Sequence, residues 1–433
     1  MPGRTPRRMA PGTSTGRPAR RALGVAAAAL ILLCGCSATP SRNPVPEHLV
    51  ETAAVPGMPR ARAWADEAPA WLDDWFLVND DDPRAPLLRG TRHYYLAISG
   101  GGANGAFSAG VLKGWTESGL RPEFTLVSGV STGAIIAPFA FLGPDYDPVL
   151  EEIYTTLSTD DAIELRSLPA ALFGSSGADT APLAATLERY FDEDVIEAIA
   201  REHRRGRVLT VGTTNLDAVR PVTWNLTAIA ASGRPEAGDL IRKIILASAA
   251  VPVAFPPVIF PVEADGQRYD ELHVDGGASS LVYLYPLDYR WGDVTRRLAV
   301  PNRPNLYILE NGHLHDDWDA VDPTLFDIAL RSQRALMGSA VRGDIYRMFL
   351  AACRDGLDFR LAYIPDDFRL TPQEPFDPVY MAALFERGHE LAREEMRWHT
   401  APPGLGESSA TACAGDRGRA GGLGSSANDV SDP

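Results

Sequence analysis

Cysteine is scarce in this sequence, and no pair of cysteines has the spacing of a metal site. The 433 residues include only Cys34, Cys36, Cys353 and Cys413. A disulfide-rich scaffold and a zinc-binding module are therefore excluded. A disulfide between Cys353 and Cys413 is possible, but Cys413 falls in a Gly/Ser-rich tail. We expect both residues to be incidental to the fold.

An excess of positive charge is also missing. The formal net charge is −15 at pH 7, from 41 Lys and Arg against 56 Asp and Glu. Such an acidic surface repels both the phosphate backbone of nucleic acids and anionic lipid headgroups. We therefore expect no nucleic-acid partner, and apolar rather than electrostatic contact with any lipid. The hydrophobic fraction of 45% is ordinary for a globular protein with a substantial core.

The apolar run near the N-terminus is too short to span a membrane as a stable helix. It covers residues 22–33 and follows an arginine-rich segment that contains no acid. A basic segment followed by a short apolar run is the pattern of an export signal. We therefore predict that residues 1–35 form a signal peptide.

The end of this run, Leu33-Cys34-Gly35-Cys36, resembles the bacterial lipobox. The resemblance implies that Cys36 is diacylated and becomes the new N-terminus, and Ser37 resembles outer-membrane retention. We expect a lipid-anchored protein of the bacterial cell envelope, in the outer membrane and facing the periplasm. An ordinary signal peptide cleaved near Ala38 is the alternative, and the Arg20-Arg21 pair also permits twin-arginine export.

The remaining chain divides into a central domain and two flanks. Residues 36–86 are rich in Pro, Ala and acid, and predict a tether followed by an N-terminal arm whose aromatic part begins at Trp64. Residues 401–433 have almost no large apolar side chain and predict a disordered tail. Residues 87–400 are left as one α/β domain. The arm from Trp64 and the loop at 174–177 are candidate lids.

The stretch from His93 to Phe141 carries the first chemical signal. Two short apolar runs, at 94–99 and 124–130, predict buried parallel strands. The second ends in Gly129-Val130-Ser131-Thr132-Gly133, which has the form of a nucleophile elbow. Ser131 would then stand at the N-terminus of a helix, where free amides and the helix dipole favour developing negative charge.

The first of these strands ends in a triple glycine, at Gly100, Gly101 and Gly102. Consecutive glycines can present several backbone N–H groups to one point, which is what an oxyanion hole requires. Neither the triple glycine nor the elbow is specific alone. Together, at the ends of adjacent strands, they indicate acyl chemistry.

A third signal is Asp275-Gly276-Gly277 after a predicted strand. An aspartate at a strand end can accept a proton from a nearby serine, although Asp-Gly-Gly is more often a simple turn. Further strands are predicted at 208–214, 222–226, 269–274, 305–310 and 357–364. Helices are predicted at 239–249, 322–353 and 377–399, the last capped by Asp377.

With these pieces in order, the chain resembles a patatin-like phospholipase from about Tyr94 to Trp398. Residues 100–105 match the family's G-x-G-x-x-G block, residues 129–133 its elbow, and residues 275–277 its D-G-[AG] block. The resemblance implies a three-layer α/β/α sandwich with a mostly parallel central sheet. It also implies hydrolysis of acyl esters of lipids without a metal or other cofactor.

Residue roles follow from the same resemblance. It implies a Ser–Asp dyad, with Ser131 as the nucleophile and Asp275 as the base, and an oxyanion hole formed by the amides around Gly101, Gly102 and Ala103. The supporting glycines are Gly100, Gly105, Gly129, Gly133, Gly276 and Gly277. Asn104 departs from the family, whose members mostly carry Arg or Lys there. The departure favours neutral or short acyl esters over an anionic headgroup.

Three other functions fit parts of the pattern. A Ser–His–Asp hydrolase needs a late histidine, and His313, His315 and His389 are available. A dinucleotide-binding protein shares the G-x-G-x-x-G motif, but its acidic residue after the second strand is replaced here by the elbow. A lipid-binding lipoprotein without turnover would retain the fold, but it would have no need of both Ser131 and Asp275.

Overall fold

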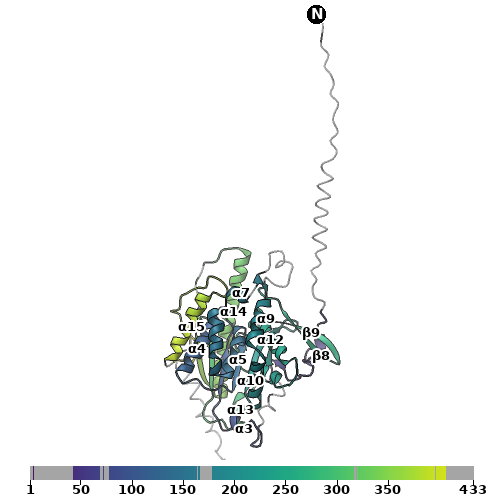
Figure 1. Cartoon of the computed structure of the whole chain (residues 1–433), viewed down its shortest axis with the longest axis vertical. Coiled ribbons are helices and arrows are strands. Elements are labelled where there is room, and N and C mark those ends of the chain that lie inside the picture. The colour runs from purple at the N-terminus through teal and green to yellow at the C-terminus, as the bar shows by residue number, and fades with distance from the viewer. Residues whose placement is uncertain are drawn as a thin grey trace, which may run out of the picture. The chain divides into compact units, whose positions relative to one another are not determined.

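The computed structural model describes residues 42–68, 72, 78–162, 164–165, 178–315, 318, 320–394 and 396–405, together with Gly3 (Figure 1). The chain divides into two units, Met1–Arg42 and Asn43–Pro433, and the account below concerns the second. The signal peptide, Cys36, the candidate lid at 174–177 and the tail beyond 405 lie outside the described residues.

A mixed sheet of nine strands forms the centre of the unit. Its order is β1-β7-β6-β3-β2-β10-β11, and the β8–β9 hairpin joins it through pairing of β9 with β6. The strands are β1 Arg62–Trp64, β2 Tyr94–Ile98, β3 Leu126–Val130, β6 Val208–Asn215, β7 Arg220–Asn225, β8 Val258–Ala264, β9 Gln267–Asp275, β10 Asn305–Glu310 and β11 Asp358–Tyr363. A separate small hairpin pairs β4 Glu164–Leu165 with β5 Ala178–Asp179.

Five neighbouring strands, β6, β3, β2, β10 and β11, run parallel. Their C-terminal ends therefore meet at one side of the sheet, which we call the carboxyl edge. In open α/β sheets, ligands bind outside this edge. The β1, β7, β8 and β9 strands are antiparallel to their neighbours.

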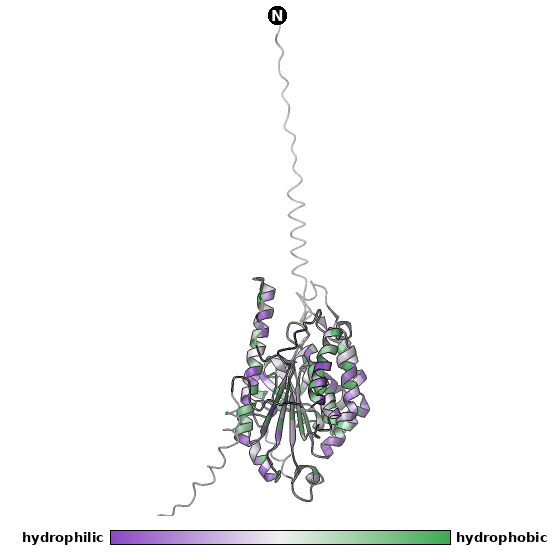
Figure 2. Ribbon diagram, turned by 90° about the vertical axis from the view of Figure 1, so that its left-hand side faces the viewer, coloured by the Kyte–Doolittle hydropathy of each residue, from purple (hydrophilic) through white to green (hydrophobic). Residues whose placement is uncertain are grey.

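Helices cover both faces of the sheet and make a three-layer α/β/α sandwich (Figure 2). Alternate side chains of a strand reach opposite layers: on β2, Leu96 and Ile98 join one core, and Tyr95 and Ala97 the other. The first face carries α4 Gly105–Glu117, α5 Thr132–Leu142, α6 Asp147–Thr156, α9 Ala181–Tyr190, α10 Glu193–Arg204, α11 Leu226–Ala230, α12 Ala237–Ser248 and α15 Pro378–Arg393. The second carries α3 Ala85–Leu88, α13 Trp291–Arg297 and α14 Leu325–Asp355.

The predicted strands and helices are all present, with some differences in extent and some additional strands. The closing helix α15 ends at Arg393 rather than at 399, because His399 leaves the helix and pairs with Leu361 through two backbone hydrogen bonds of 2.9 Å. Strands β1, β4, β5 and β8 were not predicted: the first three have at most three residues each, and Pro261 interrupts the apolar pattern of β8. Cys353 is disulfide-bonded, so the expectation that it is incidental is wrong.

The closing helix begins as its sequence predicts. The Asp377 side chain caps it by accepting hydrogen bonds from the amides of Val379 and Tyr380, and Pro378 lies in the first turn. In the part of the chain that the structure describes, no helix combines the length and apolarity that a membrane crossing requires.

Candidate active site

Ser131 lies in a strained turn between β3 and α5 at the carboxyl edge. Its backbone has φ 56° and ψ −123°, a conformation that non-glycine residues rarely adopt and that marks nucleophile elbows. A Cβ on Gly129 would lie 2.1 Å from the Gly133 carbonyl oxygen, and one on Gly133 would lie 2.3 Å from that of Ile98. Only glycine fits at these two positions, so the G-x-S-x-G spacing has a steric cause.

The elbow is also held from behind. The Ser131 amide donates to the Ser248 hydroxyl at 2.9 Å, and that hydroxyl donates to the Gly212 carbonyl at 2.6 Å. Ser248 is the last residue of α12 and is fully buried. The nucleophile candidate is therefore tied to two neighbouring elements, and its side chain is only 6% exposed.

Asp275 ends β9 at the same edge. It is 4% exposed, and its Oδ1 accepts a hydrogen bond of 2.7 Å from the Gly277 amide. Burial raises the pKa of Asp275 to about 6, and hydrogen bonding to the Ser131 hydroxyl and the Gly277 amide offsets part of the rise. The carboxylate that sequence predicts as a base therefore lies beside the serine.

The contact between them is not a fully aligned hydrogen bond. Within the described residues, the buried Oδ2 of Asp275 has no partner at full hydrogen-bonding geometry, although the Ser131 hydroxyl is near enough to affect the pKa of the carboxylate. The Ser131 hydroxyl and the Asp275 carboxylate are therefore close, but not aligned as a full hydrogen bond. Catalytic hydrogen bonds often align only when substrate is bound.

The triple glycine follows β2 and leads into the short helix η2, Gly102–Asn104. Gly101 and Gly102 are exposed. In the described part of the chain, their amides donate no hydrogen bond to another segment. Ala103 is buried, and Gly105 begins α4, where a Cβ would lie 2.2 Å from the Thr132 hydroxyl oxygen. The loop thus presents unengaged N–H groups beside the elbow.

Asn311 fixes this loop and was missed by the sequence analysis. Its Nδ2 donates to the Ser99 carbonyl at 2.9 Å, its Oδ1 accepts from the Ser108 hydroxyl at 2.6 Å, and its own amide donates to the Ser99 hydroxyl at 2.8 Å. A Cβ on Gly101, which has φ 155°, would lie 2.5 Å from the Asn311 carbonyl oxygen. The available signal was a polar residue directly after the predicted strand 305–310.

Leu281 packs beside Gly100 and Gly277, and it was also missed by the sequence analysis. Its Cδ2 atom would lie 3.2 Å from a Cβ on either Gly100 or Gly277, the glycines beside Ser131 and Asp275. Its carbonyl accepts from the Gly100 amide at 3.1 Å, and its own amide donates to the Asp344 carboxylate of α14 at 2.8 Å. The loop that covers the two candidate residues is therefore attached to α14.

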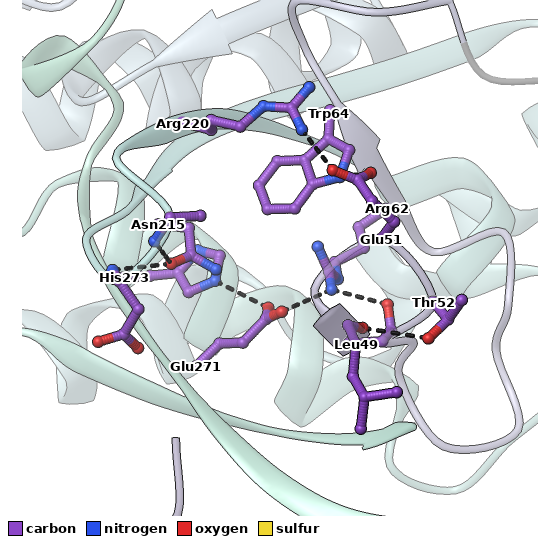
Figure 3. A network of polar contacts seen from close by, with 12 residues as sticks. Leu49, Glu51, Thr52, Arg62, Trp64, Asn215, Arg220, Glu271 and His273 are labelled. Carbon is purple, nitrogen blue, oxygen red and sulfur yellow. Dashed lines mark hydrogen bonds and ion pairs between the residues drawn. The ribbon is translucent and has the colours of Figure 1, made fainter. Parts of the chain in front are cut away.

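The strand that carries Asp275 is braced by a buried polar network (Figure 3). His273 bonds Thr213 through Nδ1 at 2.8 Å and Glu271 through Nε2 at 3.2 Å. Glu271 also pairs with Arg62 at 2.6 Å, and Arg62 donates to the Ala53 carbonyl at 2.7 Å. The N-terminal arm is thus connected to alternate residues, Glu271 and His273, of the strand that ends in the candidate base.

Asn104 accepts a hydrogen bond of 2.7 Å from the Tyr380 hydroxyl on α15. This contact orders the glycine loop where most of the resembled family has a cation. Glycines 276 and 277 follow the aspartate in the short helix η4, Gly276–Ala278. A Cβ on Gly276 would lie 2.6 Å from the Gly212 carbonyl oxygen. Six of the eight predicted glycines therefore lie against the elbow, its neighbouring segments or the aspartate's turn. Gly101 lies against Asn311, and Gly102 faces open space.

Most candidate histidines of a triad are engaged elsewhere. His315 pairs with Asp366 at 3.0 Å, and His389 pairs with Glu117 at 2.8 Å. His273 is fully buried with both ring nitrogens bonded as above. His313 is half-buried, two residues after Asn311 at the carboxyl edge. Among the described residues, no group of three or more His, Cys, Asp or Glu side chains could hold a metal ion.

Fold and site together define an α/β protein with an elbow serine, a neighbouring aspartate and a glycine loop at one sheet edge. A family model described as "Patatin-like phospholipase" matches residues 96–288. Residues 96–288 therefore match the patatin-like phospholipase family, and this match supports a lipid-hydrolysing enzyme. Among curated proteins, none matches the chain.

Three solved structures are similar to the chain at low identity. VipD from Legionella pneumophila has a TM-score of 0.34 and 13% identity, over 71% of this chain and 67% of VipD. Human GIVD cytosolic phospholipase A2 has a TM-score of 0.30 and 11% identity, over 76% of this chain and 56% of that one. ExoU of Pseudomonas aeruginosa, in complex with SpcU, has a TM-score of 0.27 and 14% identity, over 77% and 60% of the two chains.

Proposed function

We propose that the chain hydrolyses carboxylic acyl esters of lipids through a Ser131–Asp275 dyad and an acyl-enzyme intermediate. The observation that carries the proposal is the pairing of a strained elbow serine with a buried aspartate whose pKa of about 6 leaves it ionised at neutral pH and still basic. The family's D-G-[AG] and G-x-S-x-G blocks support the same two residues.

The reaction would proceed in two balanced steps. Ser131 Oγ attacks the ester carbonyl carbon while the Asp275 carboxylate takes its proton, and the amides of Gly101, Gly102 and Ala103 hold the oxyanion. The intermediate then expels the alcohol, which takes the proton from Asp275. Water next attacks the acyl-enzyme, gives its proton to Asp275, and the fatty acid leaves as the proton returns to Ser131.

The test is a hydrolysis panel of p-nitrophenyl esters and defined phospholipids, combined with organophosphonate labelling. Ser131→Ala and Asp275→Asn should each abolish turnover, and Ser131→Ala should abolish labelling. The exposed Ser232→Ala and Asp265→Asn serve as matched controls and should retain full activity. Folded wild-type protein that neither labels nor turns over any ester would support the lipid-binding alternative instead.

A Ser–His–Asp triad is the competing mechanism, and His313 is the histidine to test because of its place at the carboxyl edge. The dyad predicts that His313→Ala keeps most of the activity on a soluble ester. A His313→Ala protein as inactive as Ser131→Ala would favour the triad.

The same proposal includes a lipid anchor at Cys36 and a place in the bacterial outer membrane, facing the periplasm. The lipobox-like Leu33-Cys34-Gly35-Cys36 and the following Ser37 support it. Mass spectrometry of the mature N-terminus should find a diacylated Cys36, and Cys36→Ser should release the protein from the membrane fraction. An unmodified start at or after Ser37 would contradict the anchor.

A further inference from the structure

One helix extends well beyond the layer to which it belongs. Asp344 of α14 bonds the Leu281 loop at the carboxyl edge, so this residue marks the level of the candidate active site. The helix begins nineteen residues earlier, at Leu325, and at 1.5 Å per residue its start lies about 28 Å further along the axis. Figure 2 shows it rising past the end of the sheet. We call residues 325–340 the α14 projection.

Among the described residues, the core reaches only the last turn of the α14 projection, where Met337 and Ala340 pack against it. No residue between Asp327 and Ala340 whose side chain is described is buried, and the first buried one is Val341. Leu336 is 72% exposed, and Ile328 is also exposed. Helices in proteins are stabilised mainly by packing of an apolar face. A helix start that the described residues leave largely uncovered, with exposed Leu and Ile, therefore indicates a surface that binds something outside the chain.

Other exposed apolar side chains of the described residues gather at the same edge of the sheet. Val253 is 82% exposed, in the segment whose Ala250 carbonyl accepts from the Asp275 amide. The β6–β7 turn extends past the carboxyl edge, and the loop between β11 and α15 leads back from it. The exposed residues of these segments are Leu216, Val219, Leu370 and Val379. Their concentration beside the site is the pattern of an interaction surface rather than scattered surface apolarity.

The position at which the N-terminal arm joins the sheet indicates which partner this apolar surface binds. Asn43 exchanges two hydrogen bonds with Asp270 of β9. The last residue of β6, Asn215, pairs with His273 of the same β9 strand. Asp270 is three residues further out, so the chain enters about 10 Å beyond the end of β6, on the site's side. Six residues lie between Cys36 and Asn43, and the seven steps along the backbone span at most about 25 Å.

A lipid at Cys36 would therefore hold the domain close to the bilayer by its carboxyl edge, since a domain of this size is roughly 50 Å across. We propose that the α14 projection is a lipid-docking element that seats the candidate active site on the bilayer bearing the chain's own anchor. The proposal rests on the proposed function, and it deepens that function by naming the lipids of the anchoring membrane as the substrate pool.

Charge on the projection is consistent with a phospholipid surface. In a chain of net charge −15, the projection contains two arginines, Arg331 and Arg334, and one acid, Asp327. Apolar residues interleaved with arginine are typical of helices that lie in the membrane interface, so the projection is locally suited to lipid although the protein as a whole is acidic.

The experiment uses the full lipidated chain carrying Ser131→Ala, so that no lipid is consumed. An environment-sensitive dye is attached at Leu336→Cys or, as a matched control, at Leu120→Cys, which is 64% exposed after α4 at the opposite edge. Protein without either substitution measures background labelling. Vesicles are phosphatidylcholine alone or phosphatidylethanolamine with phosphatidylglycerol.

The expected result is a blue shift at position 336 on vesicles and no shift at 120. A shift on both vesicle types supports apolar docking, and a shift only with phosphatidylglycerol supports docking assisted by the arginines. No shift at 336 in anchored protein overturns the proposal. A shift already present without vesicles and lost on dilution also overturns it, because a second copy of the chain then covers the helix.

A second measurement separates docking from catalysis. In protein with Ser131 intact, the double variant Ile328→Ser and Leu336→Ser should lose at least several-fold of its rate on vesicle phospholipid and keep its rate on a soluble ester. Leu120→Ser should change neither. If wild-type protein hydrolyses neither vesicle phospholipid nor the soluble ester, the proposed function is contradicted. If the double variant keeps the wild-type rate on vesicles, only the docking proposal is contradicted.

Discussion

Gly100 packs directly against Ser131: a Cβ at position 100 would lie 3.2 Å from the serine Cβ and 3.8 Å from its Oγ. The same Cβ would also lie 3.2 Å from Leu281 Cδ2. The side chain that would perform the attack is thus bounded by a residue with no side chain, and there is no space for a methyl group without displacing one of its neighbours.

Gly100→Ala should therefore impair turnover more than it impairs folding. Displacing a nucleophile by a fraction of an ångström costs on the order of 10-fold to 100-fold in rate, and overpacking of one methyl costs about 1–3 kcal/mol in stability. Steady-state kinetics on a soluble ester and thermal unfolding measure the two effects. Gly338→Ala, which faces open space in α14, should keep full activity and gain about 0.5–1 kcal/mol. An active Gly100→Ala protein would contradict this account of the elbow.

The pH dependence should follow the ionisation of Asp275. Burial raises the pKa of this carboxyl to about 6, and only its ionised form can accept the serine proton. The value of kcat/KM on a soluble ester should therefore be low at pH 5, half-maximal near pH 6 and level above pH 7, since this ratio reports ionisation of the free enzyme. If active His313→Ala protein still loses kcat/KM at low pH, His313 is not the source of this loss. If the loss at low pH disappears in the variant, its source is His313 rather than Asp275.

The short motifs predicted most of the fold and the positions of the two candidate residues, because each motif encodes a local geometry. An elbow needs Gly129 and Gly133 for close backbone approach, and strand ends are readable from apolar runs that stop at glycine. The contacts of Asn311 and Leu281 were not predicted, because they join segments far away in the sequence; the one signal for Asn311 was its place directly after strand 305–310. The β8 strand was missed for a related reason: it pairs with β9 at the sheet margin and otherwise only bridges to Ala54 among the described residues, and Pro261 is tolerated there.

Asn311→Ala tests whether the glycine loop depends on the hydrogen bonds of the Asn311 side chain. The substitution removes the side-chain bonds to Ser99 and Ser108 and leaves buried polar atoms without partners, which costs roughly 2–4 kcal/mol. The amides at 101 and 102 would lose their fixed direction. Because an oxyanion hole acts in the transition state, kcat should fall while KM changes little.

Asn305→Ala, at the opposite end of the same strand, is the matched control for Asn311→Ala and should leave both constants unchanged. Urea unfolding measures the change in the free energy of unfolding, and steady-state kinetics on a soluble ester measures kcat and KM. A rise in KM with unchanged kcat would show that Asn311 supports substrate binding rather than the transition state.

Glu310, beside Asn311, should make the protein less stable as pH rises. It is buried, and within the described residues its Oε2 has no hydrogen-bond partner. Burial raises its pKa to about 8, a hydrogen bond with Ser99 lowers it, and the charge of Asp344 raises it further. The folded state therefore holds a proton that the unfolded chain releases near pH 4.3. The stability that the protonated group contributes is complete below that pH and is lost as pH rises through about 8.

Glu310→Gln keeps the shape of the side chain and removes its titration. The stability of the variant relative to wild type should increase by roughly 1.4 kcal/mol per pH unit between about pH 4.5 and 8, then level off. Denaturant unfolding of both proteins across this range measures the difference, and the exposed Glu47→Gln provides a control whose curve should parallel wild type. A constant difference between Glu310→Gln and wild type would mean that Glu310 is ionised in the folded protein, with a partner that meets its charge.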